Sequence, residues 1–217
     1  MKPWIISWME RFIAVVRDAF EDRVICIGLQ GSYGRDEATE SSDIDVVVIL
    51  DKVTIEDLRY YQKLIAPLPE RSRVCGFVSG KEELISWEKS DLFQFYHDTR
   101  VMYGTLNFLN HIISPSDAKR AVLIGACNIY HACVHNVVHE NDLGILRSLF
   151  KNAYFVLQAK NFCDNGNYCK NKIELRKALS QSDRSIIDAL SPTVDNFDSL
   201  SEELLQWAGN IIKSYSI

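Results

Sequence analysis

The sequence predicts an α+β chain, with a mixed sheet in the first half and a helical bundle in the second. Three strand candidates lie in the first eighty positions: the apolar run Val24–Leu29, the β-branched run Val46–Ile49, and Val74–Ser79. No good strand candidate follows Asp117. Between the halves, Ser114-Pro115 puts a capping residue before a proline, which is typical of a helix start. We therefore expect a sheet domain over residues 1–113 and a helical domain over residues 114–217.

The other elements of the first half follow from local patterns. Apolar residues before the first strand recur on one face of an amphipathic helix: Trp4, Trp8, Phe12, Val15 and Val16. A second helix should begin at the capping residue Thr54 and end before Pro67. Further helices are expected at Gly80–Leu84 and Trp87–His97, and a short strand at Arg100–Tyr103.

The second half reads as helices joined by short turns. The expected helices are Ala118–Glu140, Leu143–Phe162, Lys170–Leu179, Asp183–Leu190 and Leu200–Tyr215. The turn Asp164-Asn165-Gly166-Asn167 separates the second of these from the third.

Composition narrows the class of protein. The 217 residues are 47% hydrophobic, which is enough for a proper core, and the formal net charge of −5 argues against a dedicated nucleic-acid binder. The first twenty residues lack the basic start and cleavage site of a signal peptide, so the six cysteines are expected to be free thiols in a cytoplasmic protein. No uninterrupted apolar run reaches the ~18 residues of a membrane span, so no membrane partner is expected.

Two aspartates at the start of the second strand are the first candidate site. In a strand, residues i and i+2 point the same way, so Asp43 and Asp45 project from one face while Ile44 points to the other. Two carboxylates this close repel each other unless a cation lies between them. Mg²⁺ suits the pair, because it binds a few carboxylates together with substrate phosphates.

A glycine-rich turn after the first strand is the second candidate site. Gly31 and Gly34 permit a tight turn and a close approach of a ligand to the backbone. Ser32 offers a hydroxyl and a backbone N–H, and Arg35 offers a planar fork of donors for phosphate oxygens. Either motif alone is compatible with an ordinary turn or strand start, but their order and spacing together favour a nucleotide site.

Together these motifs, Gly31-Ser32-Tyr33-Gly34-Arg35 and Ser42-Asp43-Ile44-Asp45, resemble the signature of the nucleotidyltransferase superfamily typified by DNA polymerase β. The likeness is greatest to the aminoglycoside and minimal nucleotidyltransferases of bacteria. It implies a nucleotidyltransferase domain followed by a helical substrate-binding domain, with the acceptor in the cleft between them. The implied reaction is Mg²⁺-dependent transfer of a nucleoside monophosphate from a triphosphate, with ATP expected, to a hydroxyl of a small molecule such as an aminoglycoside-like antibiotic.

The resemblance extends more loosely into the second half. Lys172, two residues before Glu174, matches a lysine that approaches the triphosphate in the aminoglycoside adenylyltransferases. The alternative is a solvated lysine at a helix start. His131, His135 and His139 form a stripe along one helix. A polar helix face is the favoured interpretation of the stripe, because its outer members lie ~12 Å apart.

One family feature is missing. The resemblance implies a third carboxylate on the strand beside the aspartates, but the expected strand contains only Cys75 or Phe77 at that place. Glu70, Glu82 or a histidine of the stripe could replace it. The alternative function is therefore a nucleotide-binding regulatory or antitoxin-like module that acts on a protein partner, with weak or no transfer.

Overall fold

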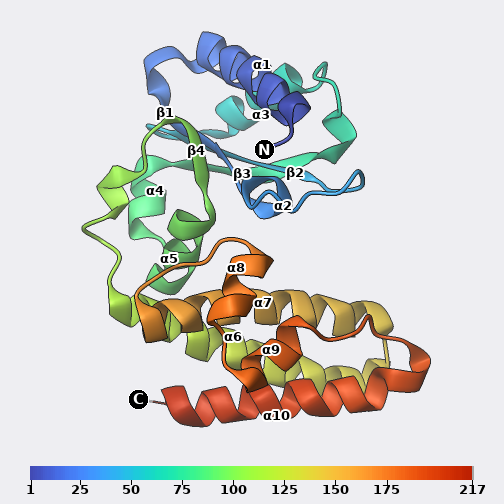
Figure 1. Ribbon diagram of the computed structural model, residues 1–217. Coiled ribbons are helices and arrows are strands. Elements are labelled where there is room, and N and C mark those ends of the chain that lie inside the picture. The colour runs from blue at the N-terminus through green and yellow to red at the C-terminus, as the bar shows by residue number, and fades with distance from the viewer. Residues whose placement is uncertain (217) are drawn as a thin grey trace. The chain divides into compact units, whose positions relative to one another are not determined.

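The structure is a computed structural model that describes residues 1–216, and it forms two compact units. The first comprises Met1–Ile113 and the second Ser114–Ile217 (Figure 1). The expected α+β class is confirmed: the first unit contains the sheet, and no strand forms among residues 114–216.

The four strands of the first unit form one mixed sheet. They are β1 (Val24–Leu29), β2 (Ile44–Leu50), β3 (Val74–Gly80) and β4 (Arg100–Gly104), in the order β3-β2-β1-β4. β1 is antiparallel to both of its neighbours, whereas β2 and β3 are parallel. The parallel pair is joined by the helix α3, as a parallel connection requires. Its register sets Asp45 directly opposite Cys75.

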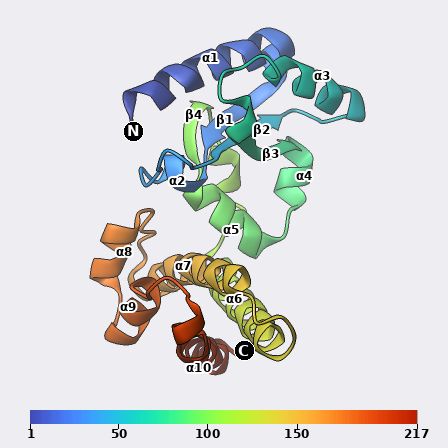
Figure 2. The same ribbon diagram turned by 90° about the vertical axis from the view of Figure 1, so that its right-hand side faces the viewer.

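Helices cover both faces of the sheet (Figure 2). Helices α1 (Pro3–Phe20) and α3 (Ile55–Ile65) pack on one face, while α4 (Lys81–Ser86) and α5 (Lys89–Asp98) pack on the other. Alternate residues of β2 enter the two cores: Ile44, Val46 and Val48 face α1, while Val47 and Ile49 face α5. Asp45 has the same parity as Val47, so it projects from the α4/α5 face.

The first helix forms as expected, but its buried face differs in detail. Its buried residues are Ile5, Trp8, Met9, Phe12, Val16 and Phe20. Trp4 remains 39% exposed and meets the Tyr33 ring edge-on, with 5.4 Å between ring centroids. Trp4 therefore lies at the edge of the core, where it covers the buried Tyr33 ring and keeps part of its own surface in solvent.

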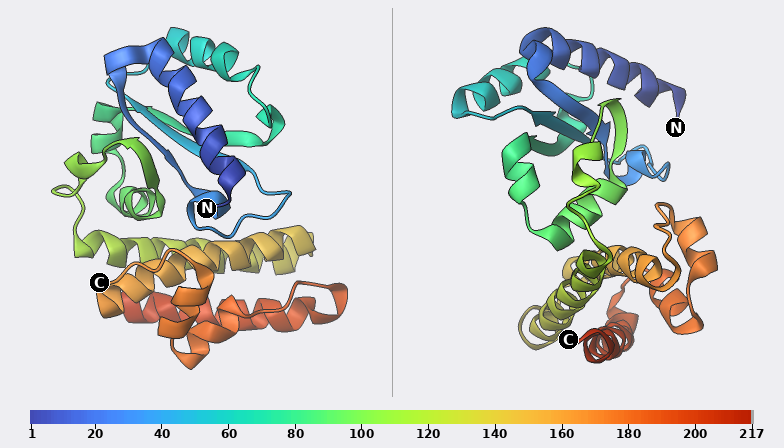
Figure 3. Two further views of the ribbon diagram at one scale, coloured as in Figure 1. Left: turned by 45° about the horizontal axis from the view of Figure 1, so that its top comes forward. Right: turned by 90° about the vertical axis from the view of Figure 1, so that its left-hand side faces the viewer.

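The second unit is a bundle of helices (Figure 3). Its elements are α6 (Pro115–His135) with a π-helical continuation (Asn136–Glu140), α7 (Leu143–Asn165), α8 (Lys172–Ala178), α9 (Gln181–Ile187) and α10 (Phe197–Tyr215). α6 packs against both α7 and α10. Its start is the expected cap: the Asp117 carboxylate accepts from the Ser114 backbone N–H at 2.7 Å.

One helix in the described part of the chain, Pro115–Glu140, is long and apolar enough to cross a membrane by length and composition alone. The expectation from uninterrupted apolar runs did not consider this helix, because its polar residues are spaced along it. His131, His135 and His139 are all exposed on it. The helix packs against α7 and α10, so its apolar side serves the bundle.

All six cysteines are free thiols in the structure. Cys26, Cys133 and Cys169 are buried, whereas Cys75 and Cys127 are exposed. Burial raises the pKa of the Cys26 thiol to about 12, so this residue packs as a small neutral hydrophobe.

A buried carboxylate ties three helices of the second unit together. Asp183 of α9 accepts from Lys160 Nζ of α7 at 2.9 Å, from Trp207 Nε1 of α10 at 3.0 Å and from Ser180 Oγ at 2.8 Å. Burial alone would raise the pKa of the Asp183 carboxyl, but the bonds from these donors outweigh it and lower the pKa. The charged form therefore stabilises the bundle.

We expect Asp183→Asn to destabilise the helical unit by about 1–3 kcal/mol, because buried donors lose a charged acceptor. A lowered pKa means that this stabilisation is present above the unfolded-state pKa of about 3.9 and is lost as the pH falls through the folded-state value. Acid titration followed by the fluorescence of Trp207, the one tryptophan of this unit, should show a weaker pH dependence in the variant. Asp164→Asn is the matched control, since Asp164 contacts the same Lys160 at the surface and should cost about 0–1 kcal/mol. If both variants lost the same amount of stability, Asp183 would not be the buried charged acceptor that stabilises the bundle.

Candidate functional site

The predicted glycine turn is a single helical turn at the end of β1. Helix α2 (Gly31–Gly34) begins after Gln30, whose backbone N–H donates to the Asp45 carbonyl at 2.8 Å. The turn closes through Gly34 N–H to Gln30 O at 3.0 Å and Arg35 N–H to Gly31 O at 3.1 Å. Ser32 is half-buried at its second position. The two motifs are therefore joined through the backbone.

Gly31 is required here for two independent reasons. Its φ of +60° lies in the left-handed region that side chains disfavour. A Cβ at this position would also overlap Asp45 Oδ2. The Asp45 carboxylate therefore lies directly against the backbone of the Gly-Ser turn, and glycine leaves the space for it.

The two aspartates occupy the leading edge of β2, as the strand period predicts. Asp43 is exposed just before the strand, and Asp45 is half-buried within it. Ile44 between them is fully buried on the opposite face. The carboxylates thus open to solvent at one end of the sheet, next to α2.

Cys75 lies where the missing third carboxylate was expected. It pairs with Asp45 across the parallel strands, and its Sγ donates to Asp45 Oδ1 at 2.9 Å. Burial, followed by this hydrogen bond and the charges of Asp45 and Asp43, raises the pKa of the Cys75 thiol to about 12. Phe77, the other candidate, packs against Trp87 and Phe95 instead.

The glutamates considered as substitutes lie elsewhere. Glu82 follows the far end of β3, about 16 Å along the strand from Cys75 at 3.3 Å per residue. Glu70 precedes the near end of β3, but its carboxylate bonds Arg73 Nη1 at 2.9 Å. Neither glutamate has a contact with Asp43 or Asp45 among those that the described residues make.

Arg35 has protein partners that the sequence did not reveal. Its Nη1 donates to both carboxylate oxygens of Asp98, at 2.8 and 3.1 Å, and its Nε lies 3.3 Å from Glu37 Oε2. The side chains of Arg35 and Asp98 are only 11% and 8% exposed. The expectation that Arg35 offers its whole fork to phosphate must therefore be revised, because the guanidinium already neutralises a buried carboxylate.

Arg73 connects the two motifs, and sequence reasoning missed it as well. Its Nη2 donates to Tyr33 Oη at 2.6 Å, and both Nε and Nη2 donate to the Ser42 carbonyl at 3.0 and 2.8 Å. It thereby holds α2 next to the segment that leads into Asp43. The sequence could have indicated a positively charged partner for Asp98, because an acidic residue at a helix C-terminus is unfavourable with the helix dipole. No sequence pattern indicated the role of Arg73.

The aspartate pair fits a divalent cation in its donor chemistry and in its exposure. Hard carboxylate oxygens suit Mg²⁺, and Asp43 is exposed while Asp45 is half-buried. Over residues 1–216, no cluster of three or more histidine, cysteine or acidic side chains has the arrangement to hold an ion. A cation here would complete its coordination with ligand oxygens and water.

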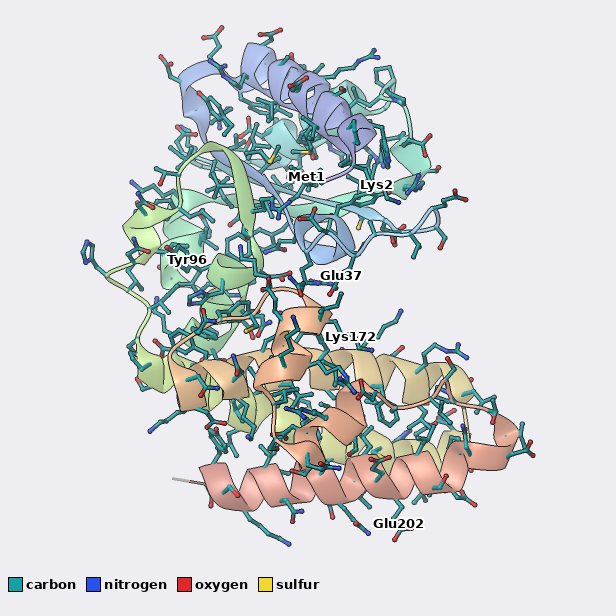
Figure 4. The ribbon with its side chains drawn as sticks, in the orientation of Figure 1. Met1, Lys2, Glu37, Tyr96, Lys172 and Glu202 are labelled. Atoms are coloured by element: carbon teal, nitrogen blue, oxygen red, sulfur yellow. The ribbon has the colours of Figure 1, made fainter. Side chains whose placement is uncertain are left out.

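Lys172 belongs to the second unit. It is the first residue of α8 and is exposed there, and it is labelled in Figure 4. Asn171 caps the same helix, accepting from Glu174 N–H at 2.8 Å. The pKa of the Asp188 carboxyl is lowered mainly by its hydrogen bond from Arg176, and the positive charge of Lys172 lowers it further.

Comparison with known families agrees with the site. Residues 9–103 match the nucleotidyltransferase domain family. This span contains β1, α2 and β2, and hence every candidate site residue except Lys172. Over these residues the chain is therefore similar to the nucleotidyltransferase domain family.

A solved structure shares the fold over the whole chain. It is spectinomycin adenyltransferase AAD(9) from Enterococcus faecialis, determined with ATP and spectinomycin. The TM-score is 0.55 at 12% identity, over 95% of this chain and 98% of that one. No curated protein matches significantly. At this identity the likeness shows a shared fold.

Proposed function

We propose that the chain transfers a nucleoside monophosphate from ATP to a hydroxyl of an aminoglycoside-like small molecule, in a divalent-metal-dependent reaction. The observation that carries the proposal is the Asp45 carboxylate lying against Gly31, beside Asp43. This contact joins an aspartate pair to a Gly-Ser turn at the end of a strand. Such a site can hold triphosphate oxygens and the cation that accompanies them.

In this proposal, each motif has a distinct task. Asp43 and Asp45 hold Mg²⁺, which when bound neutralises charge on the phosphates. The backbone and hydroxyl of Ser32 contact the triphosphate beside Gly31. Arg35 supports the turn through Asp98 and adds positive charge nearby. The rate enhancement then comes from positioning the triphosphate and the acceptor and from neutralising the negative charge of the phosphates.

The proposed chemistry is an in-line displacement. The acceptor oxygen forms a bond to the α-phosphorus, the bond from that phosphorus to the bridging oxygen breaks, and pyrophosphate leaves with the electron pair. The hydroxyl proton must pass to a base or to solvent. Cys75 is a poor base at neutral pH, because its raised pKa keeps it protonated. Slow transfer is therefore expected.

The helical unit is proposed to bind the acceptor and to present Lys172 to the triphosphate. The likeness to AAD(9), which was determined with ATP and spectinomycin, extends over 95% of this chain and so includes this unit. A net charge of −5 also favours a polycationic acceptor. Lys172 is exposed and carries the positive charge that a phosphate contact needs.

The test is to incubate the full chain with Mg²⁺, ATP and a panel of spectinomycin and aminoglycosides. We expect pyrophosphate release that depends on one acceptor, and an acceptor mass increased by one adenylyl group. Lys172→Ala should weaken ATP binding by about 10- to 150-fold, since one charge-assisted contact contributes about 1.5–3 kcal/mol. Lys177→Ala, at another exposed position of α8, is the matched control and should change nothing.

The second candidate function is the regulatory module, and Cys75 in place of a carboxylate is the observation that favours it. Such a module would bind ATP through the same motifs without using it. ATP binding without pyrophosphate release on any hydroxyl acceptor would therefore replace the enzyme proposal with this one.

A further inference from the structure

A polar groove runs along one face of α10 within the helical unit. Its volume is about 310 Å³, and small-molecule sites commonly occupy about 300–1,000 Å³. The α10 residues that line it recur every three or four positions from Glu203 to Tyr215, so they share one face of the helix, which is about 18 Å long between them. Helix α9 and the serine that caps it form the opposite wall, together with Lys160 of α7. The groove is therefore formed entirely by the second unit.

The lining combines buried apolar side chains with a rim of uncharged polar ones. Ile186, Trp207 and Ile211 are the buried apolar members. The exposed members all carry hydroxyl or amide groups: Ser180, Ser182, Ser185, Gln206, Asn210 and Ser214. Hydroxyl and amide groups both donate and accept hydrogen bonds, whereas apolar and aromatic side chains pack against carbon. A ring with hydroxyls at its edge and C–H groups on its faces matches both kinds of surface.

Three of the residues that line the groove are charged, and one of them has no partner within the part of the chain that the structure describes. Lys160 Nζ donates to Asp183 Oδ2 at 2.9 Å, so these two charges compensate each other. Glu203 is half-buried, and no ion pair or hydrogen bond to its carboxylate forms among the described residues. The neighbouring Glu202, by contrast, is exposed and accepts from Gln206 Nε2 at 3.0 Å. A partly desolvated carboxylate gains most from a cationic donor, so the groove favours a positively charged ligand.

We propose that this groove is a binding site for an aminated sugar, that is, a hydroxyl-bearing ring with a protonated amine. Glu203 accepts from the ammonium group, the serine and amide side chains of the rim bond the hydroxyls, and the buried apolar residues pack against the C–H faces of the ring. The length of the lined face admits more than one ring in a row. The inference goes beyond the transfer reaction, because it assigns a ligand to the helical unit without using the aspartate pair or the Gly-Ser turn.

The experiment is a titration of the full chain with D-glucosamine and, separately, with D-glucose, in the absence of ATP and metal. Binding is followed by NMR through the indole N–H signal of Trp207, which lines the groove and donates to Asp183 at 3.0 Å. The signal is assigned by its loss in Trp207→Phe. Glucosamine differs from glucose by a protonated amine in place of one hydroxyl, so we expect it to bind at least about tenfold more tightly. Glu203→Gln should abolish this preference, and the matched control Glu202→Gln should retain it.

Gln206→Lys is a second variant at an exposed helical position that accepts lysine readily. It places an ammonium group of the protein one turn from Glu203, so it should also remove the preference for glucosamine. The inference is overturned by an unchanged Trp207 signal at saturating glucosamine, by a preference that survives Glu203→Gln, or by equally tight binding of 1,4-diaminobutane, a cation without hydroxyls. Glu203-dependent binding in a chain that transfers nothing would reject the proposed reaction and keep this site, whereas transfer without such binding would do the reverse.

Discussion

Replacing Asp43 and Asp45 together by asparagine should reduce nucleotide transfer by roughly a thousandfold or more, because a bound cation contributes several kcal/mol of charge stabilisation. The variant should also lose the metal-dependent part of the thermal stabilisation by ATP. At about 100 times its dissociation constant, a ligand stabilises the native state by about 2.7 kcal/mol. Thermal unfolding with ATP, with and without Mg²⁺, measures this part directly.

The structure explains why asparagine is the informative replacement. The Cys75 thiol can still donate to an amide oxygen at position 45, so the local packing is retained while the charge is removed. The ligand-free variant should be at least as stable as the wild type, since a like-charge pair is relieved. Asp51→Asn, just past the other end of β2, is the matched control and should leave transfer intact. An unchanged Mg²⁺-dependent shift in the double variant would remove the metal assignment.

Much of the fold could be predicted because its determinants are local. The expected strands β1 and β2 are almost fully buried, whereas β3 forms as expected but is partly exposed. Thr54 and Ser114 cap the helices that they were expected to cap. The alternation along β2 also predicted correctly that Asp43 and Asp45 flank a buried Ile44. These features depend on residues within a few positions of one another.

What could not be predicted depends on partners far apart in the chain. Arg73 reaches Ser42 and Tyr33, and Arg35 reaches Asp98 across 63 positions. Periodicity carries no information on such pairs. Whether Cys75 or Phe77 occupies the position expected for the third carboxylate likewise depends on the register of the parallel strands, which a strand pattern alone does not fix.

The buried pair of Arg35 and Asp98 has a structural consequence larger than any direct contact with phosphate. Asp98 ends α5, and its side chain is 8% exposed and forms its ion pair with the Arg35 guanidinium. Arg35 follows α2 directly, so the pair anchors the Gly-Ser turn to the helix that covers the sheet. The positions of Gly31 and Ser32 therefore depend on an ion pair that a nucleotide need not touch.

We accordingly expect Arg35→Ala to destabilise the first unit by about 3–5 kcal/mol, which is the usual cost of leaving one buried charge without its partner. Chemical denaturation of the ligand-free protein measures this cost. Arg100→Ala is the matched control: Arg100 pairs with the exposed Asp36 at 2.8 Å, and surface pairs contribute about 0–1 kcal/mol.

The double variant Arg35→Ala/Asp98→Asn decides between the two roles of Arg35. If the arginine acts through Asp98, removing the buried charge should recover much of the lost stability, and the two single changes will not be additive. Nucleotide affinity should then recover along with stability, because the turn regains its support. If instead Arg35→Ala leaves the ligand-free protein as stable as the wild type and weakens only ATP binding, the guanidinium contacts phosphate directly. The pair with Asp98 would then be its resting position, exchanged when the nucleotide arrives.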